Sequence, residues 1–350
     1  MNIFLSIALP VYNGADYLEE AIQSVLGQSF TNFEFVIVDN HSTDATYSII
    51  QKYAAVDNRI KYYRNEQTTG QVDNVNRAWK YCTGEWIQFF CHDDIMLPGC
   101  LKCLHEQIDL HKANKEIGLI GHGPAWLFSN HVIHNPGFAI AGKFIYTAEI
   151  FQQDNKLNYF SSFKVHEYKA VKSLSALIDF SKGIYLPALT TALVKKEVME
   201  HLLGFDRQYM HFDIFAWSLL LFKYDYLHID LPLTLTRIHS NQVAVDARKS
   251  LQTIKDNQTF YKLFLKRCRA IIPITFSNKL YVLLMPISTA CGIISVELIK
   301  GSLKNAFSIL FKLPVWWWPI ILLLLPRNYP RERNRTQILS QFVPLNLIYP

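Results

Sequence analysis

The sequence has little charge and no cysteine framework. Of its 350 residues only 18% are charged and 50% are hydrophobic, which excludes an intrinsically disordered chain. The six cysteines, at positions 82, 91, 100, 103, 268 and 291, lack the spacing of a disulfide scaffold, which favours reduced thiols in a cytosolic compartment. Cys100 and Cys103 form a C-x-x-C, but no second Cys or His pair completes a zinc site. We therefore interpret both as helix-packing residues.

Signals for secretion and for nucleic-acid binding are also missing. The N-terminus MNIFLSIALPVYNG has no basic n-region and no small-residue cleavage site, so we expect a first strand and no signal peptide. No nucleic-acid-binding motif occurs, and the net charge is a modest +6. Lys and Arg become denser after residue 240, beside apolar segments. This pattern indicates an anionic membrane surface as partner rather than nucleic acid.

The first 123 residues alternate short apolar runs with helical periods. We expect strands over 3–12, 33–40, 59–65, 85–90 and 117–123, with helices between them. This repetition predicts a Rossmann-like α/β fold, with a mostly parallel sheet covered on both faces. Segment 124–170 is rich in aromatic residues and favours hairpins and loops, and helix and strand patterns return over 171–240.

Polar residues follow three of these strands: Tyr12-Asn13-Gly14, Asp39-Asn40 and Asp93-Asp94. Parallel sheets bind ligands at the carboxyl ends of their strands, so these groups are expected at one edge. Adjacent carboxylates raise each other's pKa unless something positive lies between them. The stretch FFCHDDIMLP (89–98) therefore indicates either a solvated turn or a divalent-cation site, and the shared edge favours the cation.

Four segments resemble the family 2 nucleotide-sugar glycosyltransferases, which have the A-type glycosyltransferase fold. They are SIALPVYNGADYLEEAIQSVLGQSFTNFEFVIVDNHSTDAT, CTGEWIQFFCHDDIMLP, GFDRQYMHFDIFAWSL and TRIHSNQVA, and the resemblance covers about residues 3–245. It implies a catalytic domain over 1–245, with a nucleotide-sugar-binding half at 1–123 and an acceptor half at 124–245. It also implies a metal-dependent, inverting transfer of a sugar to a glycan or lipid-linked acceptor, as in polysaccharide biosynthesis.

The resemblance assigns roles to the residues at the sheet edge. Asp39 would accept hydrogen bonds from the nucleotide base, in a pocket shaped by Pro10 and Tyr12. Asp93 would lie near the ribose and sugar, and Asp94 would bind Mg²⁺ or Mn²⁺. A divalent ion suits this chemistry because the departing nucleoside diphosphate gains negative charge, which an oxygen-bound cation neutralises.

Two positions depart from the family pattern. Cys91 stands where many members carry an acidic residue, which leaves two carboxylates and an open ligand count. Val75 stands where many members carry an arginine. The cation expected near the phosphates would then have to come from Arg64, Arg77 or Arg237.

Asp213 is the candidate catalytic base, at the position of the family's E-D pair, with Phe212 in place of the partner. An inverting transfer needs one carboxylate to take the proton of the acceptor hydroxyl. Capping of the helix IFAWSLLLF is compatible with this role, and Asp206 is the rival. Arg237 and His239, two residues apart at a strand end, would face the diphosphate with paired donors. Surface cations on a loop are the alternative.

The C-terminal region, 246–350, is basic and apolar. Segments 280–299 and 306–325 are about long enough to cross a bilayer, but they contain Glu297, Lys312 and prolines. The three tryptophans at 316–318 suit the headgroup boundary. Cations flank both segments, so interfacial or re-entrant helices fit better than two spans. We expect a protein at the cytoplasmic face of a membrane, peripheral, re-entrant or integral through residues 280–325.

Three other functions compete with this one. A polyprenyl-phosphate glycosyl synthase shares the donor site but glycosylates a lipid phosphate, which needs no strong base. A nucleotidyltransferase needs a Gly-rich phosphate loop with Lys or Arg, which LPVYNGADY lacks. A degenerate, non-catalytic nucleotide-sugar-binding membrane protein would keep the fold, but the intact Asp39, Asp93, Asp94 and Asp213 argue against it. The donor sugar, the base and the acceptor stay open.

Overall fold

The computed structural model describes residues 4–128, 163–171, 186–207, 212–238 and 266. Nearly all of them belong to one compact unit, Met1–Ala170 with Leu186–His239. The apolar segments at 280–325 and the domain boundary at 245 lie outside the described residues. No helix within the described ranges is long and apolar enough to cross a membrane.

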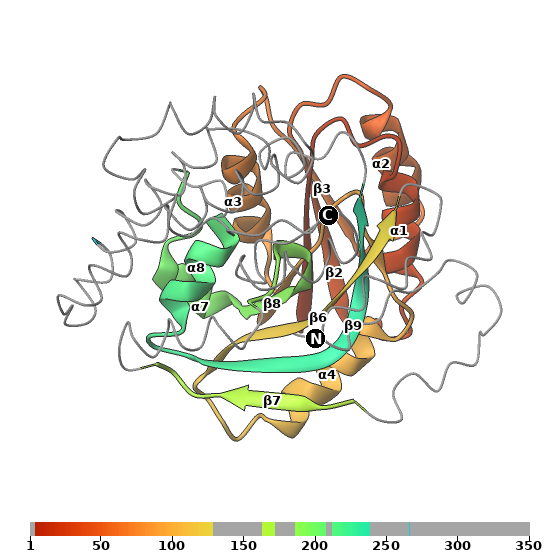
Figure 1. Ribbon diagram of the computed structural model, residues 1–350. Helices are drawn as coiled ribbons and strands as arrows, with labels where there is room; N and C mark the ends of the chain where they lie inside the picture. Colours follow the sequence, from red (N-terminus) through yellow and green to blue (C-terminus); the bar gives the residue numbers. More distant parts are fainter. Residues whose placement is uncertain (1–3, 129–162, 172–185, 208–211, 239–265, 267–350) are drawn as a thin grey trace, which may run out of the picture. The chain divides into compact units, whose positions relative to one another are not determined.

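The unit is built on a mixed β-sheet (Figure 1). Counting described residues only, it has nine strands, in the order β3 (Ile60–Arg64), β2 (Phe33–Asp39), β1 (Leu5–Val11), β4 (Trp86–Phe89), β8 (Ala192–Lys195), β6 (Ile117–Phe128), β9 (Asp225–Ile238) and β5 (Ile95–Met96), with β7 (Val165–Tyr168) paired to β9. The first five predicted strands therefore exist, and the one expected at 117–123 continues to Phe128.

The directions of the strands correct the prediction of a mostly parallel sheet. Strands β3, β2, β1 and β4 are parallel, as the βαβ pattern predicted. However, β8 runs antiparallel to β4 and β6, and β5 and β7 run antiparallel to β9. Strand periodicity reports which residues face the core, but it does not report the direction of a partner far away in the chain.

Helices cover both faces of the sheet, as predicted (Figure 1). Helices α1 (Leu18–Leu26), α2 (Thr46–Ala54) and α4 (Cys100–Leu110) lie on one face. Helices α3 (Gln71–Tyr81), α7 (Lys196–Leu202) and α8 (Phe212–Leu220) lie on the other. On that second face Phe89 of β4 packs against Phe205 and Trp217, with ring centroids 5.2 and 6.3 Å away.

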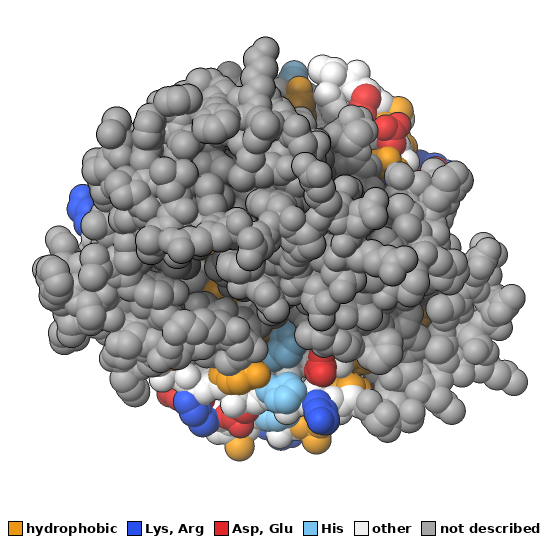
Figure 2. Space-filling view, viewed as in Figure 1, with side chains coloured by type: hydrophobic (Ala, Val, Ile, Leu, Met, Phe, Trp, Pro, Cys, Tyr) orange, Lys and Arg blue, Asp and Glu red, His pale blue; other side chains and the backbone are white. Residues whose placement is uncertain are grey.

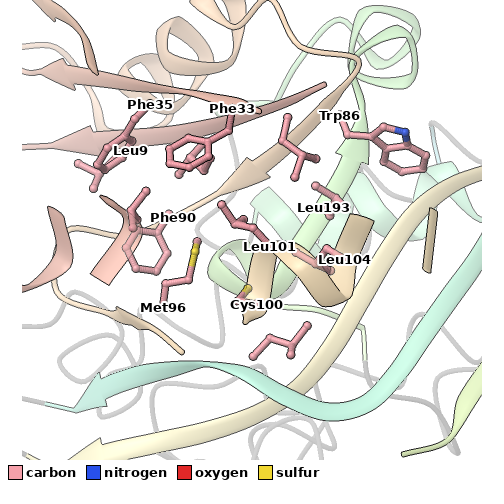
Figure 3. Packing of buried hydrophobic residues seen from close by; sticks show 14 of the residues in the cluster. Leu9, Phe33, Phe35, Trp86, Phe90, Met96, Cys100, Leu101, Leu104 and Leu193 are labelled. Carbon is pink, nitrogen blue, oxygen red and sulfur yellow. The ribbon is translucent and has the colours of Figure 1, made fainter. Parts of the chain in front are cut away.

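The hydrophobic core under α1 and α4 explains the C-x-x-C. Cys100 of α4 lies in a cluster that includes Leu9, Phe90 and Leu193 (Figure 3), and Cys103 belongs to the same cluster. Burial, followed by the charge of Glu106, raises the pKa of the Cys103 thiol to about 12. Both cysteines are packing residues, as predicted.

The strand β7 closes the far edge of the unit with polar contacts. Figure 2 shows histidine side chains beside acidic and basic ones at the lower edge of this view, where β7 lies in Figure 1. Lys169, just after β7, donates to Glu167 at 2.6 Å and to Asp225 of β9 at 2.9 Å. These contacts hold β7 against β9, at the opposite side of the unit from the strand ends that carry the predicted site (Figure 1).

Candidate active site

The loops after β1 and β2 are locked together by polar contacts. Asn13 and His41 have left-handed backbone, with φ of 48° and 63°, a conformation that Asn tolerates better than most residues. The N–H of Asn13 donates to Ser42 Oγ at 2.9 Å, and the N–H of Thr43 donates to Asn13 Oδ1 at 2.9 Å. The two strand ends therefore form one preorganised rim.

Asp44 fastens the same two loops. Its Oδ2 accepts from the N–H of Ala15 at 3.0 Å, and its Oδ1 accepts from the N–H of Thr46, at the start of α2, at 3.0 Å. Partial burial raises the pKa of Asp44, but the hydrogen bonds from Thr46 and Ala15 outweigh it and lower that pKa below its usual range. Asp44 is a structural carboxylate that stays charged.

Asp39, at the carboxyl end of β2, is completely buried. Its Oδ1 accepts from the N–H of Ser42 at 2.9 Å, while Tyr62 Oη at 3.4 Å and Arg64 Nε at 3.3 Å approach its Oδ2. A carboxylate has about four acceptor positions, so these three contacts leave acceptor capacity on Asp39. In contrast, Tyr12 at the end of β1 is 47% exposed and open to a ligand.

Pro10 lies within β1 at a point where the missing N–H costs nothing. The pairing of β1 with β4 ends at Ala8 opposite Phe89, so residue 10 lies beyond the last paired position on that side. A proline is tolerated in a central strand only where no ladder hydrogen bond is required. The rigid ring therefore lies two residues before Tyr12, at the rim where the sequence predicted the base pocket.

The acidic pair lies in a tight turn directly after β4. The N–H of Asp94 donates to the carbonyl of Cys91 at 3.3 Å, which folds residues 91–94 back on themselves. One ligand atom each of Cys91, Asp93 and Asp94 lies within 4.8 Å of the others. Burial, followed by the charge of Asp93, raises the pKa of Asp94 well above its usual range. The turn thus gathers one sulfur and two carboxylates.

Arg237 stabilises this turn through hydrogen bonds to both aspartates. It is 2% exposed, its N–H donates to Asp94 Oδ1 at 2.9 Å, and its Nε donates to the carbonyl of Asp93 at 3.0 Å. Its guanidinium also pairs with Glu20 and lies 4.6 Å from the ring centroid of Tyr17. The sequence predicted Arg237 as a diphosphate donor, and the structure places it in contacts within the protein. His239 lies outside the described residues.

Asp213, the candidate base, lies in the first turn of α8. Its Oδ2 accepts from the N–H of Leu189 at 3.0 Å, and its Oδ1 accepts from the N–H of Ile214 at 2.8 Å. Burial, followed by the charges of Asp94, Asp93 and Asp213, raises the pKa of the Cys91 thiol well above its usual range. Asp213 is therefore close enough to act on the acidic turn electrostatically.

The two remaining candidate cations are also engaged. Arg64 donates to the carbonyl of Ser42 at 2.9 Å besides its contact with Asp39. Arg77 donates to Asn65 Oδ1 at 2.8 Å. Both stabilise the rim formed by β2 and β3, in a network that runs through the buried Asn65.

Asn76 is a functional support that the sequence analysis did not identify. Its side-chain amide donates to the carbonyl of Phe205 and accepts from the N–H of Phe205, both at 2.8 Å. It thereby holds the GFD segment that precedes α8, where Gly204 has φ +86°. An Asn inside a helical pattern, where its propensity is poor, was the available signal.

Comparisons with known proteins agree with this architecture. Residues 6–168 match the family model described as Glycosyl transferase family 2. A Campylobacter jejuni protein named GalNAc(5)-diNAcBac-PP-undecaprenol beta-1,3-glucosyltransferase is 34% identical over 134 residues, which cover 38% of this chain and 40% of that protein. The chain thus matches well under two thirds of that relative's length.

Two solved structures share the fold. S. aureus TarS 1–349 in complex with UDP-GlcNAc superposes with a TM-score of 0.54 at 16% identity, covering 97% of this chain and 84% of that chain. The mannosyltransferase PcManGT from Pyrobaculum calidifontis, in complex with GDP-Man and Mn²⁺, has a TM-score of 0.51 at 14% identity, covering 91% and 83%.

The sheet, its helices and the acidic turn at the carboxyl edge define the A-type glycosyltransferase fold. Over residues 6–168 the chain is similar to glycosyl transferase family 2.

Proposed function

We propose that the protein is an inverting glycosyltransferase that moves a sugar from a nucleoside diphosphate sugar to a hydroxyl of a glycan or lipid-linked acceptor. The observation that carries this proposal is the convergence of the acidic turn and Asp213 around Cys91. A donor-side metal site and an acceptor-side carboxylate at one sheet edge are the two parts that such a transfer needs.

The rim of β1 and β2 is proposed to hold the nucleotide. Tyr12 offers an exposed ring for stacking on the base, and Pro10 fixes the backbone that presents it. Asp39 is proposed to accept a hydrogen bond from the base with the acceptor capacity that Ser42, Tyr62 and Arg64 leave open. The ribose and the sugar would then extend toward Asp93.

The residues of the acidic turn fit a divalent cation. Asp93 and Asp94 offer hard oxygen ligands. Burial raises the pKa of Asp94 because it destabilises the carboxylate form, and a bound cation would stabilise that form. Mg²⁺ or Mn²⁺ held there would neutralise the negative charge that the nucleoside diphosphate gains as it departs. The Mn²⁺ in the mannosyltransferase complex with GDP-Man is consistent with this assignment.

Asp213 is proposed to take the proton of the acceptor hydroxyl. Hydrogen bonds from the N–H groups of Leu189 and Ile214 fix the position of its carboxylate. As the proton transfers to Asp213, the acceptor oxygen attacks the anomeric carbon on the side opposite the leaving diphosphate, which inverts the configuration. Asp206, next to the Phe205 backbone that Asn76 holds, is the alternative base.

A lipid-linked saccharide is the proposed acceptor. The Campylobacter relative is named for an undecaprenol diphosphate-linked acceptor, and the basic, apolar region after residue 245 suits a protein that works at a membrane surface. The protein is accordingly proposed to act on the cytoplasmic side of a membrane in polysaccharide biosynthesis.

A binding screen followed by a transfer assay tests the function. Full-length protein would be titrated with UDP- and GDP-sugars, with and without Mn²⁺, and the bound donor then offered to undecaprenyl diphosphate-linked saccharides and to undecaprenyl phosphate. We expect Mn²⁺-dependent donor binding and transfer to the saccharide. Transfer only to the phosphate would instead identify a polyprenyl-phosphate glycosyl synthase. Donor binding without transfer to any acceptor would indicate a non-catalytic binding protein.

A further inference from the structure

The acidic turn carries a sulfur that the proposed function does not use. We propose that Cys91 is a metal ligand, and that the site is a mixed thiolate–carboxylate centre that binds thiophilic divalent ions such as Co²⁺ and Zn²⁺ in preference to Mg²⁺. The inference rests on the proposed function, because it concerns the cation of the same site. It assigns a chemical role to Cys91, which stands where the family pattern has an acidic residue.

The backbone of the turn brings the sulfur to the carboxylates. The N–H of Phe90 donates to the carbonyl of Ala8 at 3.0 Å, so β1 fixes the chain immediately before Cys91. The bond from the Asp94 N–H to the Cys91 carbonyl then reverses the chain. As a result Sγ of Cys91 and one oxygen of each aspartate lie within 4.8 Å of one another. Ligands at about 2.0–2.3 Å from a shared ion span such distances.

A buried hydroxyl packs beside the cluster. The Thr190 side chain is 3% exposed and interacts with the Asp94 carboxylate, which lowers the pKa of Asp94 against the larger effect of burial. The Arg237 N–H donates to Oδ1 of the same carboxylate at 2.9 Å. Thr190 and Arg237 therefore fix the carboxylate that lies beside the Cys91 sulfur.

The chemistry of the three ligands decides which ions the site prefers. Coordination removes the thiol proton of Cys91 to solvent, so the ion meets one thiolate and two carboxylates. With a divalent ion these ligands carry a net charge of −1, next to the guanidinium of Arg237. Thiolate ligands favour Zn²⁺ and the later first-row ions, whereas Mg²⁺ prefers oxygen ligands only. Cys91 therefore shifts selectivity away from Mg²⁺ without removing the oxygen ligands that Mg²⁺ and Mn²⁺ would use.

Co²⁺ provides a direct spectroscopic test. Full-length protein, kept reduced with a phosphine, would be titrated with Co²⁺ while the sulfur-to-metal charge-transfer absorption is recorded, and calorimetry would give Co²⁺ and Mg²⁺ affinities. We expect a band that saturates at one Co²⁺ per chain. C91S and D94N should abolish it, and C103S, whose sulfur lies in the core under α4, should keep it. C91S should weaken Co²⁺ binding by at least about 10–100-fold. Loss of a residue that only hydrogen-bonds a metal ligand already costs that much, and Cys91 is proposed to bind the metal directly.

C91D separates sulfur preference from charge. It keeps three negative ligands, so we expect Mg²⁺ affinity to rise relative to Co²⁺ while the band disappears. Wild-type protein without the band, or C91S with unchanged Co²⁺ affinity, would overturn the proposal. If UDP or GDP still binds with Mn²⁺ in those cases, the glycosyltransferase function stands and only the Cys91 assignment fails. If the wild type binds neither nucleotide with any ion, the proposed function itself fails.

Discussion

The backbone N–H of Arg237 donates a 2.9 Å hydrogen bond to Oδ1 of Asp94, across 143 positions of sequence. The guanidinium of the same residue bonds the carbonyl of Asp93 and pairs with Glu20 on α1. One residue near the end of β9 thus holds the acidic turn against the first helix of the domain. The positions of Asp93 and Asp94 therefore depend on β9, which lies more than 100 residues later in the chain.

Arg237→Met is expected to destabilise the domain. The variant keeps the backbone bond to Asp94 but loses the bond to Asp93 and the pairing with Glu20, so the free energy of unfolding should fall by about 1.5–3 kcal/mol, as for hydrogen bonds with a charged partner. Urea unfolding measures it. Lys52→Met, which breaks the exposed pair with Glu19, should change almost nothing. Unchanged stability with weaker donor binding would instead support the diphosphate role predicted from sequence.

Asp94→Asn should remove metal-dependent nucleotide binding and leave the fold intact. The amide oxygen still accepts from the Arg237 N–H, but the charge that attracts the cation is gone. Affinity for UDP or GDP in Mn²⁺ should fall at least about tenfold, or about 1.4 kcal/mol, by calorimetry. Asp109→Asn on the exposed side of α4 is the matched control. Equal Mn²⁺ stimulation in both variants would contradict the metal assignment.

Asp213→Asn should lower turnover by about 10²–10⁴-fold, the usual contribution of a general base. Donor affinity should barely change, because the proposed nucleotide site lies on β1 and β2. The asparagine oxygen can accept from only one of the N–H groups of Leu189 and Ile214, so stability should fall by about 1 kcal/mol. Asp206→Asn serves as the comparison. Near-normal transfer in Asp213→Asn would move the base to Asp206 or point to a phosphate acceptor.

His122 is expected to make the domain sensitive to acid. Burial lowers the pKa of this histidine to about 4, against an ordinary value of 6.5. Between these two values the unfolded chain binds a proton that the folded chain does not, so stability is full above pH 6.5 and is lost as the pH falls to 4. The loss from this group should be on the order of 3 kcal/mol.

Unfolding of the wild type and of His122→Gln at several pH values measures this effect. The variant should show a flatter pH dependence between pH 6.5 and 4, while His166→Gln on the exposed strand β7 should follow the wild type. An unchanged slope in His122→Gln would show that other groups govern the acid transition.

Membrane association remains a prediction from the sequence. If residues 280–325 bind a bilayer, a chain ending at residue 270 should move to the soluble fraction, whereas a chain ending at residue 330 should stay with the membrane. Fractionation of cells expressing each form measures this. A full-length protein that is monodisperse without detergent would count against the expectation.

Local patterns in the sequence determined much of the first half of the domain. The alternation of strands and helices up to residue 123, the packing of Cys100 and Cys103, and the shared edge of Tyr12, Asp39 and Asp94 all follow from periodicity and from the geometry of parallel strands. These features are predictable because each depends on residues close together in the chain.

Only the tertiary structure decided the rest. The antiparallel insertion of β8, the contact of Arg237 with the acidic turn, and the hold of Asn76 on Phe205 join residues more than 100 positions apart. Such pairings depend on how the whole chain closes around its core, and no local period encodes them. Cys91 and the two aspartates lie within 4.8 Å of one another through a local turn, but the burial of that turn and its contact with Arg237 come from the tertiary structure alone.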